Sequence, residues 1–188
     1  QDYIHNPIKN VKYKLQLFYG PKDGFEDITW YQLIEGFGEL QSFNNSGKIE
    51  CLVRLFAIFY RRKFESVKSI DLDKRVKFLE HLDIRYIYGF FLLFTSFFKF
   101  LTTESNIEID GRAIDLSLLF TQKEDTEEDN VSVDLPELGL RSTAFQMAES
   151  GVFGTMEELN ETNAFQVLLR MYDMMVRNKK REAEIENA

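Results

Sequence analysis

The sequence predicts an α+β protein that is mostly α-helical: a helical bundle body with an N-terminal strand and a small β-hairpin, followed by a C-terminal helical hairpin. Over most of the chain, apolar residues recur at three- and four-residue spacing, which is the period of a helix with one buried face. Near the N-terminus they alternate in twos instead, as in a half-buried strand. Asp110-Gly111, between two short alternating stretches, indicates the β-hairpin.

The composition suits one domain with a core of its own. A chain of 188 residues can bury roughly two-thirds of its unfolded surface. Eighteen Phe and eight Tyr supply rings for that core, whereas 29% charged residues and a net charge of −8 disfavour nonspecific binding to nucleic acid. We therefore expect protein partners and no nucleic acid. Cys51, the one cysteine, excludes an intrachain disulfide and is expected to be a small buried side chain.

The first elements expected are a strand and a helix. The strand covers 11–17, where VKYKLQL alternates apolar and polar residues, and the glycines and proline that follow force turns. Thr29 begins the helix, which runs to about Phe43, because Gln32 can complete a capping box with it. The apolar face of this helix carries Trp30, Leu33, Ile34, Phe37 and Leu40.

Three more helices are expected before residue 104. The apolar period of ECLVRLFAIF predicts a second helix that ends in the basic stretch 61–63, where cations suit the helix dipole. Asp71 is a candidate N-cap for a third helix. Asp83 is a candidate N-cap for a fourth, which runs to about Thr103.

The β-hairpin is expected next, over 107–116, and the composition of the chain changes after it. Residues 121–138 are acidic and poor in apolar side chains, which predicts a solvated connector. A short helix over 142–150 is expected next, and a capping box of Thr155 with Glu158 opens the last helix. The predicted parts are therefore 1–120 (strand, four-helix body and β-hairpin), 121–138 (acidic flexible connector) and 139–188 (helical hairpin and charged tail).

The fourth predicted helix contains YIYGFFLLFTSFF, with seven aromatic residues in 13 positions. Its rings could fill a private core, line an interface with another protein, or face a membrane. A membrane span needs about 20 apolar residues, whereas this stretch has 13 and lies between the charged residues Arg85 and Lys99. We therefore expect no span. If the helix docks a partner, Phe90, Phe91, Phe94, Phe97 and Phe98 supply its apolar surface. Met171, Met174 and Met175 would supply an adaptable second surface on the last helix.

No catalytic, cofactor-binding or metal-binding residues are predicted. His5 and His81 lie far apart in the sequence and belong to no metal-ligand spacing. The acidic run 124–129 lacks the central glycine and terminal glutamate of an EF-hand, and the glycines match no phosphate-binding loop. We therefore expect a protein that is not an enzyme and needs no cofactor.

A group of cations leaves two interpretations open. They could gather into a basic patch that docks a partner, or each could form a solvated pair on a helix surface. These cations are Arg54, Arg61, Arg62, Lys63, Arg75 and Lys77.

Several stretches also resemble a known group of proteins. They are LFYGPKDGFEDITWYQ, ECLVRLFAIFYRRKFE, DKRVKFLEHLDIRYIYGFFLLFTSF and MAESGVFGTMEELNETNAFQVLLRMYD. Together, over about 10–178, they resemble poorly characterised proteins encoded among the structural and tail genes of tailed bacteriophages, particularly phages of Bacteroides-type hosts. The resemblance rests on apolar patterns and brings no catalytic residues.

That resemblance implies a role in virion morphogenesis. A tail assembly chaperone that shields hydrophobic tail subunits is the function expected first. A structural virion subunit, in the tail or connector, that buries its aromatic helix in an oligomeric interface is the alternative. Either role implies protein partners, such as tail subunits or further copies of the chain, in the host cytoplasm during phage assembly or in the virion.

Overall fold

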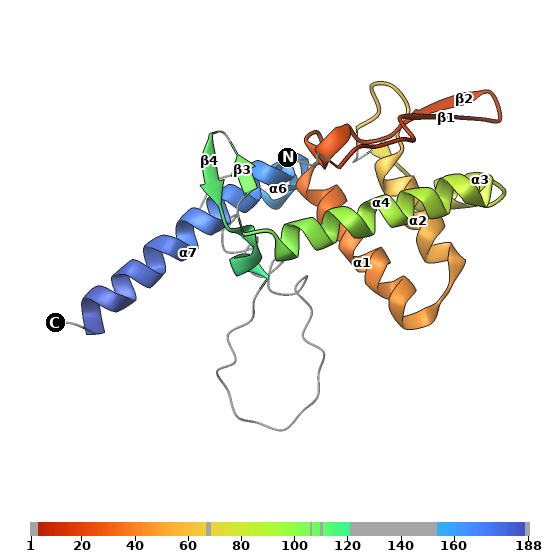
Figure 1. Ribbon diagram of the computed structural model, residues 1–188. Coiled ribbons are helices and arrows are strands. Elements are labelled where there is room, and N and C mark those ends of the chain that lie inside the picture. Colours follow the sequence, from red (N-terminus) through yellow and green to blue (C-terminus); the bar gives the residue numbers. More distant parts are fainter. Residues whose placement is uncertain (1–3, 67–68, 106, 110, 121–153, 187–188) are drawn as a thin grey trace.

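The structure is a computed structural model that describes residues 4–66, 69–105, 107–109, 111–120 and 154–186 (Figure 1). Its elements are β1 (Asn10–Tyr13), β2 (Gln16–Tyr19), the 3-10 turn η1 (Asp23–Phe25), α1 (Trp30–Ser46), α2 (Ile49–Phe59), α3 (Leu72–Leu79), α4 (Ile84–Thr103), β3 (Ile107–Ile109), β4 (Arg112–Ile114), the 3-10 turn η3 (Leu116–Leu119), α6 (Met156–Glu161) and α7 (Ala164–Glu186). Helices dominate, and the strands form two small antiparallel pairs, so the predicted α+β, mostly α class is confirmed.

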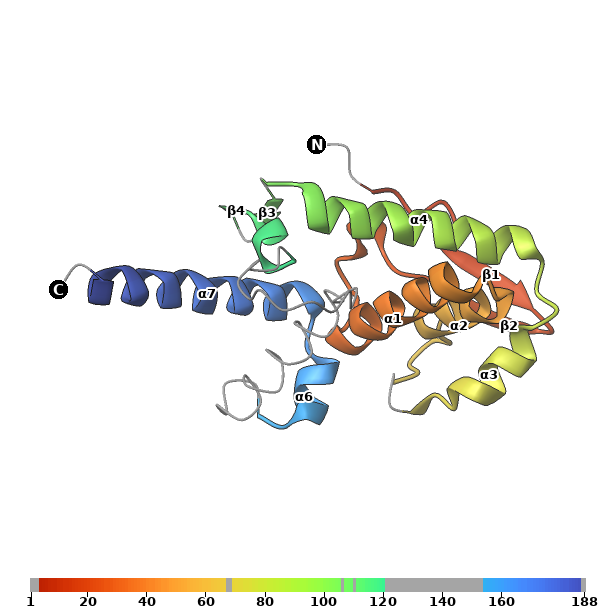
Figure 2. The same cartoon turned by 90° about the horizontal axis from the view of Figure 1, so that it is seen from below.

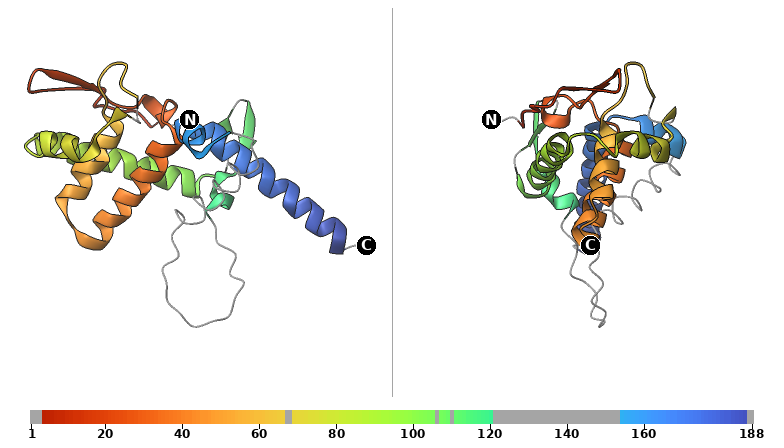
Figure 3. Two further views of the ribbon diagram at one scale, coloured as in Figure 1. Left: turned by 180° about the vertical axis from the view of Figure 1, so that it is seen from behind. Right: turned by 90° about the vertical axis from the view of Figure 1, so that its right-hand side faces the viewer.

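The helices form layers around α1 and α2 (Figures 1 and 2). These two helices lie side by side, with α4 along one side of the pair and α3 against α2 on the other. The turn η3 touches both α4 and α7, while α6 and α7 contact α1. The C-terminal part of α7 leads away from this body (Figure 3).

The N-terminal strand is in fact a hairpin, so the single strand predicted over 11–17 is wrong in its extent. The chain reverses at Lys14 and Leu15, whose φ angles of 44° and 64° belong to a two-residue hairpin turn. Such a turn normally contains Gly or Asn, and neither residue type is present here, so no local signal predicts the turn. The reversal places Phe18 in the core and leaves Leu15 in solvent at the tip, 95% exposed.

The helix caps predicted from local sequence are confirmed. Thr29 and Gln32 form the capping box of α1: the Thr29 hydroxyl accepts from the Gln32 amide at 3.3 Å, and the Gln32 side chain accepts from the Thr29 amide at 3.1 Å. Asp71 caps α3 and Asp83 caps α4, each by accepting a backbone N–H bond. The hairpin of β3 and β4 also lies where Asp110-Gly111 predicted it.

The last helix predicted from Thr155 is divided in two. The Thr155–Glu158 capping box is present, but α6 ends at Glu161 and α7 begins after Asn163. The Asn163 side chain donates to the Glu26 carbonyl at 2.6 Å and accepts from the backbone of Phe165, so it ties the break to a distant loop. The connector 121–138 and the short helix 142–150 lie outside the described residues.

The described residues share one hydrophobic core. Leu159, Val167 and Leu168 from α6 and α7 belong to the same buried cluster as the aromatic residues of α1, α2 and α4. At its centre the Phe25 ring stacks on Phe97, with 4.2 Å between ring centroids. Each buried phenylalanine stabilises the fold by about 1.5–3 kcal/mol, and each favourable ring pair adds about 0.5–1.5 kcal/mol.

Gly36 is required for the close approach of α1 to α2 and α4. A Cβ atom there would lie 2.7 Å from the Phe94 ring and 2.8 Å from the Phe59 ring, both buried. We expect Gly36→Ala to lower the free energy of unfolding by about 1–3 kcal/mol, measured by urea denaturation.

Gly89→Ala is the matched control within α4. Its Cβ would meet only the Cδ1 atom of Ile8, at 3.0 Å, and that end of a half-buried side chain can shift. Alanine also suits a helix better than glycine, so this variant should be at least as stable as the parent. Equal losses in the two variants would contradict the packing assigned to Gly36.

Candidate functional site

The aromatic helix α4 has two faces with different surroundings. Phe90, Phe94 and Phe97 are at most 1% exposed and pack against α1, α2 and η1. Their prediction as partner-binding residues is therefore corrected: they fill the core. Phe91 and Phe98 are half-buried at the margins, where Phe91 packs on Phe43 and Phe98 on Phe37.

The opposite face of α4 leaves apolar side chains in solvent. Ile84, Tyr88 and Leu92 follow one another every four residues and are 49%, 48% and 51% exposed. Tyr86, at 41%, lies beside them in the first turns of the helix. Because its inner face is fixed in the core, α4 presents this outer stripe, Ile84–Tyr88–Leu92, on a rigid support. The sequence periodicity identified these positions as apolar but did not predict which side of the helix is exposed to solvent.

Among the described helices, α4 is the one long and apolar enough to cross a membrane, judged by length and composition. The mean hydropathy of an 18-residue stretch of this helix is 1.3. The core helix of a folded domain passes the same test, and Ile87, Phe90, Phe94, Phe97 and Leu101 of this helix are buried against neighbouring elements. The test therefore does not place α4 in a membrane.

The methionines of α7 divide in the same way. Met171 is 1% exposed and belongs to the core, so its prediction as a partner-binding residue is corrected. Met174 and Met175 are half-buried on the next turn. They are accessible enough to contribute to a contact, but they do not form an open surface.

The six cations do not form one basic patch. Arg54 bridges Glu39 and Asp73, with N–O distances of 2.9 and 2.8 Å. Arg62 and the buried Arg75 both bind the carboxylate of Glu65. The other three lie apart: Lys77 is exposed on α3, whereas Arg61 and Lys63 line a pocket.

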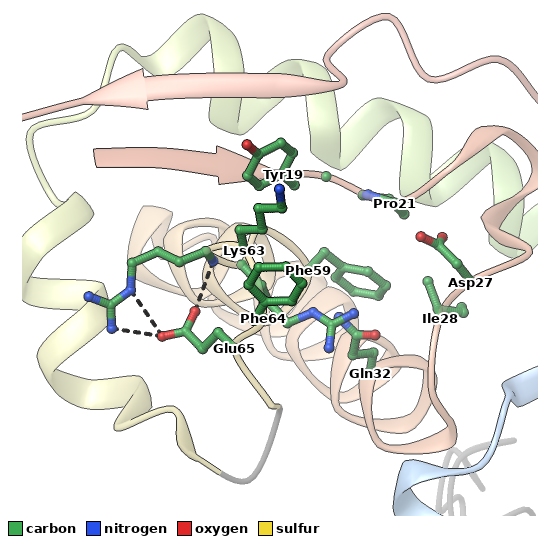
Figure 4. Close-up of a pocket in the computed structure, with 12 residues that line it drawn as sticks. Tyr19, Pro21, Asp27, Ile28, Gln32, Phe59, Lys63, Phe64 and Glu65 are labelled. Carbon is green, nitrogen blue, oxygen red and sulfur yellow. Dashed lines mark hydrogen bonds and ion pairs between the residues drawn. The ribbon is translucent and has the colours of Figure 1, made fainter. Parts of the chain in front are cut away.

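That pocket is a hollow of about 320 Å³ between β2, the segment before α1 and the loop after α2 (Figure 4). Tyr19, Lys63 and Phe64 stand on one side of it, and Pro21, Asp27 and Ile28 on the other. Gln32 reaches it from α1, but its amide already donates to the Ile58 carbonyl at 2.9 Å. Burial lowers the pKa of the Arg61 guanidinium, with Asp27 and Glu65 opposing that shift by their charge.

A cluster of two arginines around the Glu65 carboxylate fixes the loop that carries this pocket. Glu65 accepts bonds from the backbone and guanidinium of Arg62 and from the guanidinium of Arg75. Desolvation alone would raise the pKa of Glu65, but these donors outweigh it and hold the pKa at about 2. The cluster has no signature in sequence because Arg75 comes from a different element.

The remaining candidates carry no site chemistry in the described residues. His5 and His81 are exposed, each beside a single carboxylate, of Asp23 and Glu80. Cys51 was expected in the core but is half-buried, with its Sγ 3.9 Å from the Ser46 hydroxyl. Across the part of the chain that the structure describes, no group of three or more His, Cys, Asp or Glu side chains could hold a metal ion.

Comparison with known proteins gives no relative: no family model, curated protein or solved structure matches the chain. Two features are therefore the basis for inferring function. One is the outer stripe of α4, and the other is the pocket at Arg61 and Lys63 with the exposed ring of Phe64 at its mouth. Sequence reasoning placed Arg61 and Lys63 among candidate docking cations but missed Phe64.

Neighbouring positions on α4 should respond differently to truncation. Phe94→Ala leaves a cavity among buried rings and should cost about 3–5 kcal/mol of unfolding free energy. Leu92→Ala removes an exposed side chain and should change that free energy by about 0.5 kcal/mol or less. Urea unfolding of both variants measures this, and a large loss in Leu92→Ala would show that the stripe is covered.

The Glu65 carboxylate should make stability depend on pH in acid. Its folded pKa of about 2 lies below the ordinary value of 4.5, so the unfolded chain takes up a proton first as pH falls. The stabilisation is present above about pH 4.5 and is lost as pH falls toward 2. In Glu65→Gln, the slope of unfolding free energy against pH should be shallower across that window. Parallel curves for the two proteins would contradict the assignment.

Proposed function

We propose that the protein is a non-enzymatic module for protein–protein interaction, and that the outer stripe of α4 docks its partner. The observation that carries the proposal is the exposure of Ile84, Tyr88 and Leu92 on a helix whose other face is locked into the core. Side chains at this spacing form a continuous ridge, the arrangement by which helices enter apolar grooves of partners.

The size of the stripe suggests a reversible interaction. Each of its three residues is already about half-buried, so complete burial adds roughly 1 kcal/mol per side chain. Association also costs translational and rotational freedom. Because α4 is fixed before binding, little further ordering is needed, which preserves that modest gain. A chaperone that must release its client suits such a surface.

The biological setting follows from the resemblance to bacteriophage tail proteins. In that setting, the module is a tail assembly chaperone in the host cytoplasm, and its partner is a tail subunit with an apolar segment that is exposed before assembly. The stripe would cover that segment until the subunit is incorporated. No cofactor is required for this activity.

A second candidate is a structural virion subunit. It is favoured by α7, whose exposed C-terminal half leads away from the body (Figure 3). This half is charged on its surface, with Lys180 and Glu184 paired at 4.0 Å. A mostly polar helix that projects from its own domain suits a bridge to a neighbouring subunit.

Site-specific photo-crosslinking distinguishes the two functions. A photoreactive side chain is placed at Leu92, or at exposed Lys77 as the control, and the chain is co-expressed with the tail proteins of its own genome. The chaperone proposal predicts a crosslink from position 92, but not from 77, to one tail protein, with a monomer by light scattering. Crosslinks from 92 only to further copies of the chain, in a closed oligomer, would support the structural subunit instead.

A further inference from the structure

The loop between α2 and α3 holds a phenylalanine ring in solvent. Phe64 is 94% exposed, and its φ of 62° is one that residues other than glycine seldom adopt. The loop is fixed on both sides of it. Arg61 forms two backbone hydrogen bonds with Tyr19, of 2.8 and 3.0 Å, and Glu65 is bound by two arginines. Strained residues in exposed, fixed positions are enriched at binding sites.

Two cations flank this ring without an acid partner. Within the described residues, neither Arg61 nor Lys63 forms an ion pair, although Arg62 between them is neutralised by Glu65. The Lys63 ammonium lies 5.0 Å from the centroid of the Phe64 ring. Asp27, across the pocket, attracts Arg61 electrostatically but accepts its hydrogen bond from the Lys22 amide instead. The pocket is thus locally positive in a chain of net charge −8.

An open strand edge adjoins the pocket. Leu17 and Tyr19 lie on one face of β2 and are 43% and 39% exposed, and Leu15, in the turn before β2, is 95% exposed. The backbone N–H and C=O groups of Tyr19 point away from β1 and bond to Arg61. Those of Leu17, two residues earlier, point to the same edge of β2. Arg61 is the partner of Tyr19, but no described residue pairs with Leu17 on this side. An extended segment could therefore continue the sheet there.

We propose that the pocket and the adjoining edge of β2 bind an extended acidic peptide segment of another protein. An Asp or Glu carboxylate of that segment pairs with Arg61 and Lys63, while its apolar neighbours pack on Phe64 and Tyr19. The planar guanidinium can bind both oxygens of a carboxylate. The volume of about 320 Å³ accommodates a side chain and is at the lower limit for a cofactor. This surface is distinct from the stripe of α4.

Selection from a displayed library of short random peptides, with the full chain as bait, tests the proposal. Selected peptides should carry Asp or Glu beside aliphatic or aromatic residues. The best of them, compared with its twin in which Gln replaces the acid, should bind about tenfold more tightly. Arg61→Gln should abolish that difference, whereas Lys77→Gln, which removes an exposed cation from α3, should preserve it.

Two further measurements keep the test decisive. If Arg61→Gln does not fold, the double variant Lys63→Gln, Phe64→Ser alters only exposed side chains and should weaken the acidic peptide by a similar factor. Peptides without acidic residues, or affinities that neither variant changes, would overturn the proposal. Inorganic phosphate binding as tightly as the peptide would also overturn it, because the pocket would then be a small-anion site. The crosslink from Leu92 should be unaffected by Arg61→Gln, so the two surfaces can fail separately.

Discussion

The stacking of Phe25 on Phe97 joins the parts of this fold that are distant in sequence. Phe25 lies in the turn before α1, and its ring also contacts Phe59 of α2 and Phe90 and Phe94 of α4. Its backbone is held at a φ of 59°, a conformation that costs a non-glycine residue about 1 kcal/mol or more. Complete burial of the ring yields more than that, so packing determines the local backbone rather than the reverse.

This anchoring explains why the surfaces of the protein are defined. A helix as apolar as α4 could turn about its axis if its rings were interchangeable, but the Phe94 ring packs against Gly36, where a Cβ atom would lie only 2.7 Å from it. The orientation fixed in this way places Ile84, Tyr88 and Leu92 outside. The same core holds Tyr60 against Phe56, with 3.9 Å between ring centroids, immediately before the loop that carries the pocket.

Local signals in the sequence predicted most of the helices, because a cap such as Thr29 with Gln32 is complete within one turn. The errors lie where the deciding contact is distant or lacks a usual residue type. Lys14 and Leu15 form a hairpin turn without glycine, and the break before α7 depends on Glu26, 137 positions from Asn163. For the candidate site, periodicity identified the apolar positions of α4 but not their division between core and solvent, which depends on α1 and α2.

The pocket shows the same limit at the level of single charges. Arg61, Arg62 and Lys63 are equivalent in the sequence, yet the Glu65 carboxylate selects Arg62 and is completed by Arg75 from α3. A buried ion pair of this kind stabilises the fold little more than apolar residues of similar size would, because desolvating both charges offsets most of their attraction. The pair instead determines position. It occupies the Glu65 carboxylate, which Arg61 and Lys63 would otherwise share, and it holds the turn that exposes Phe64. A binding surface therefore arises from which arginine the fold pairs, rather than from how many the sequence contains.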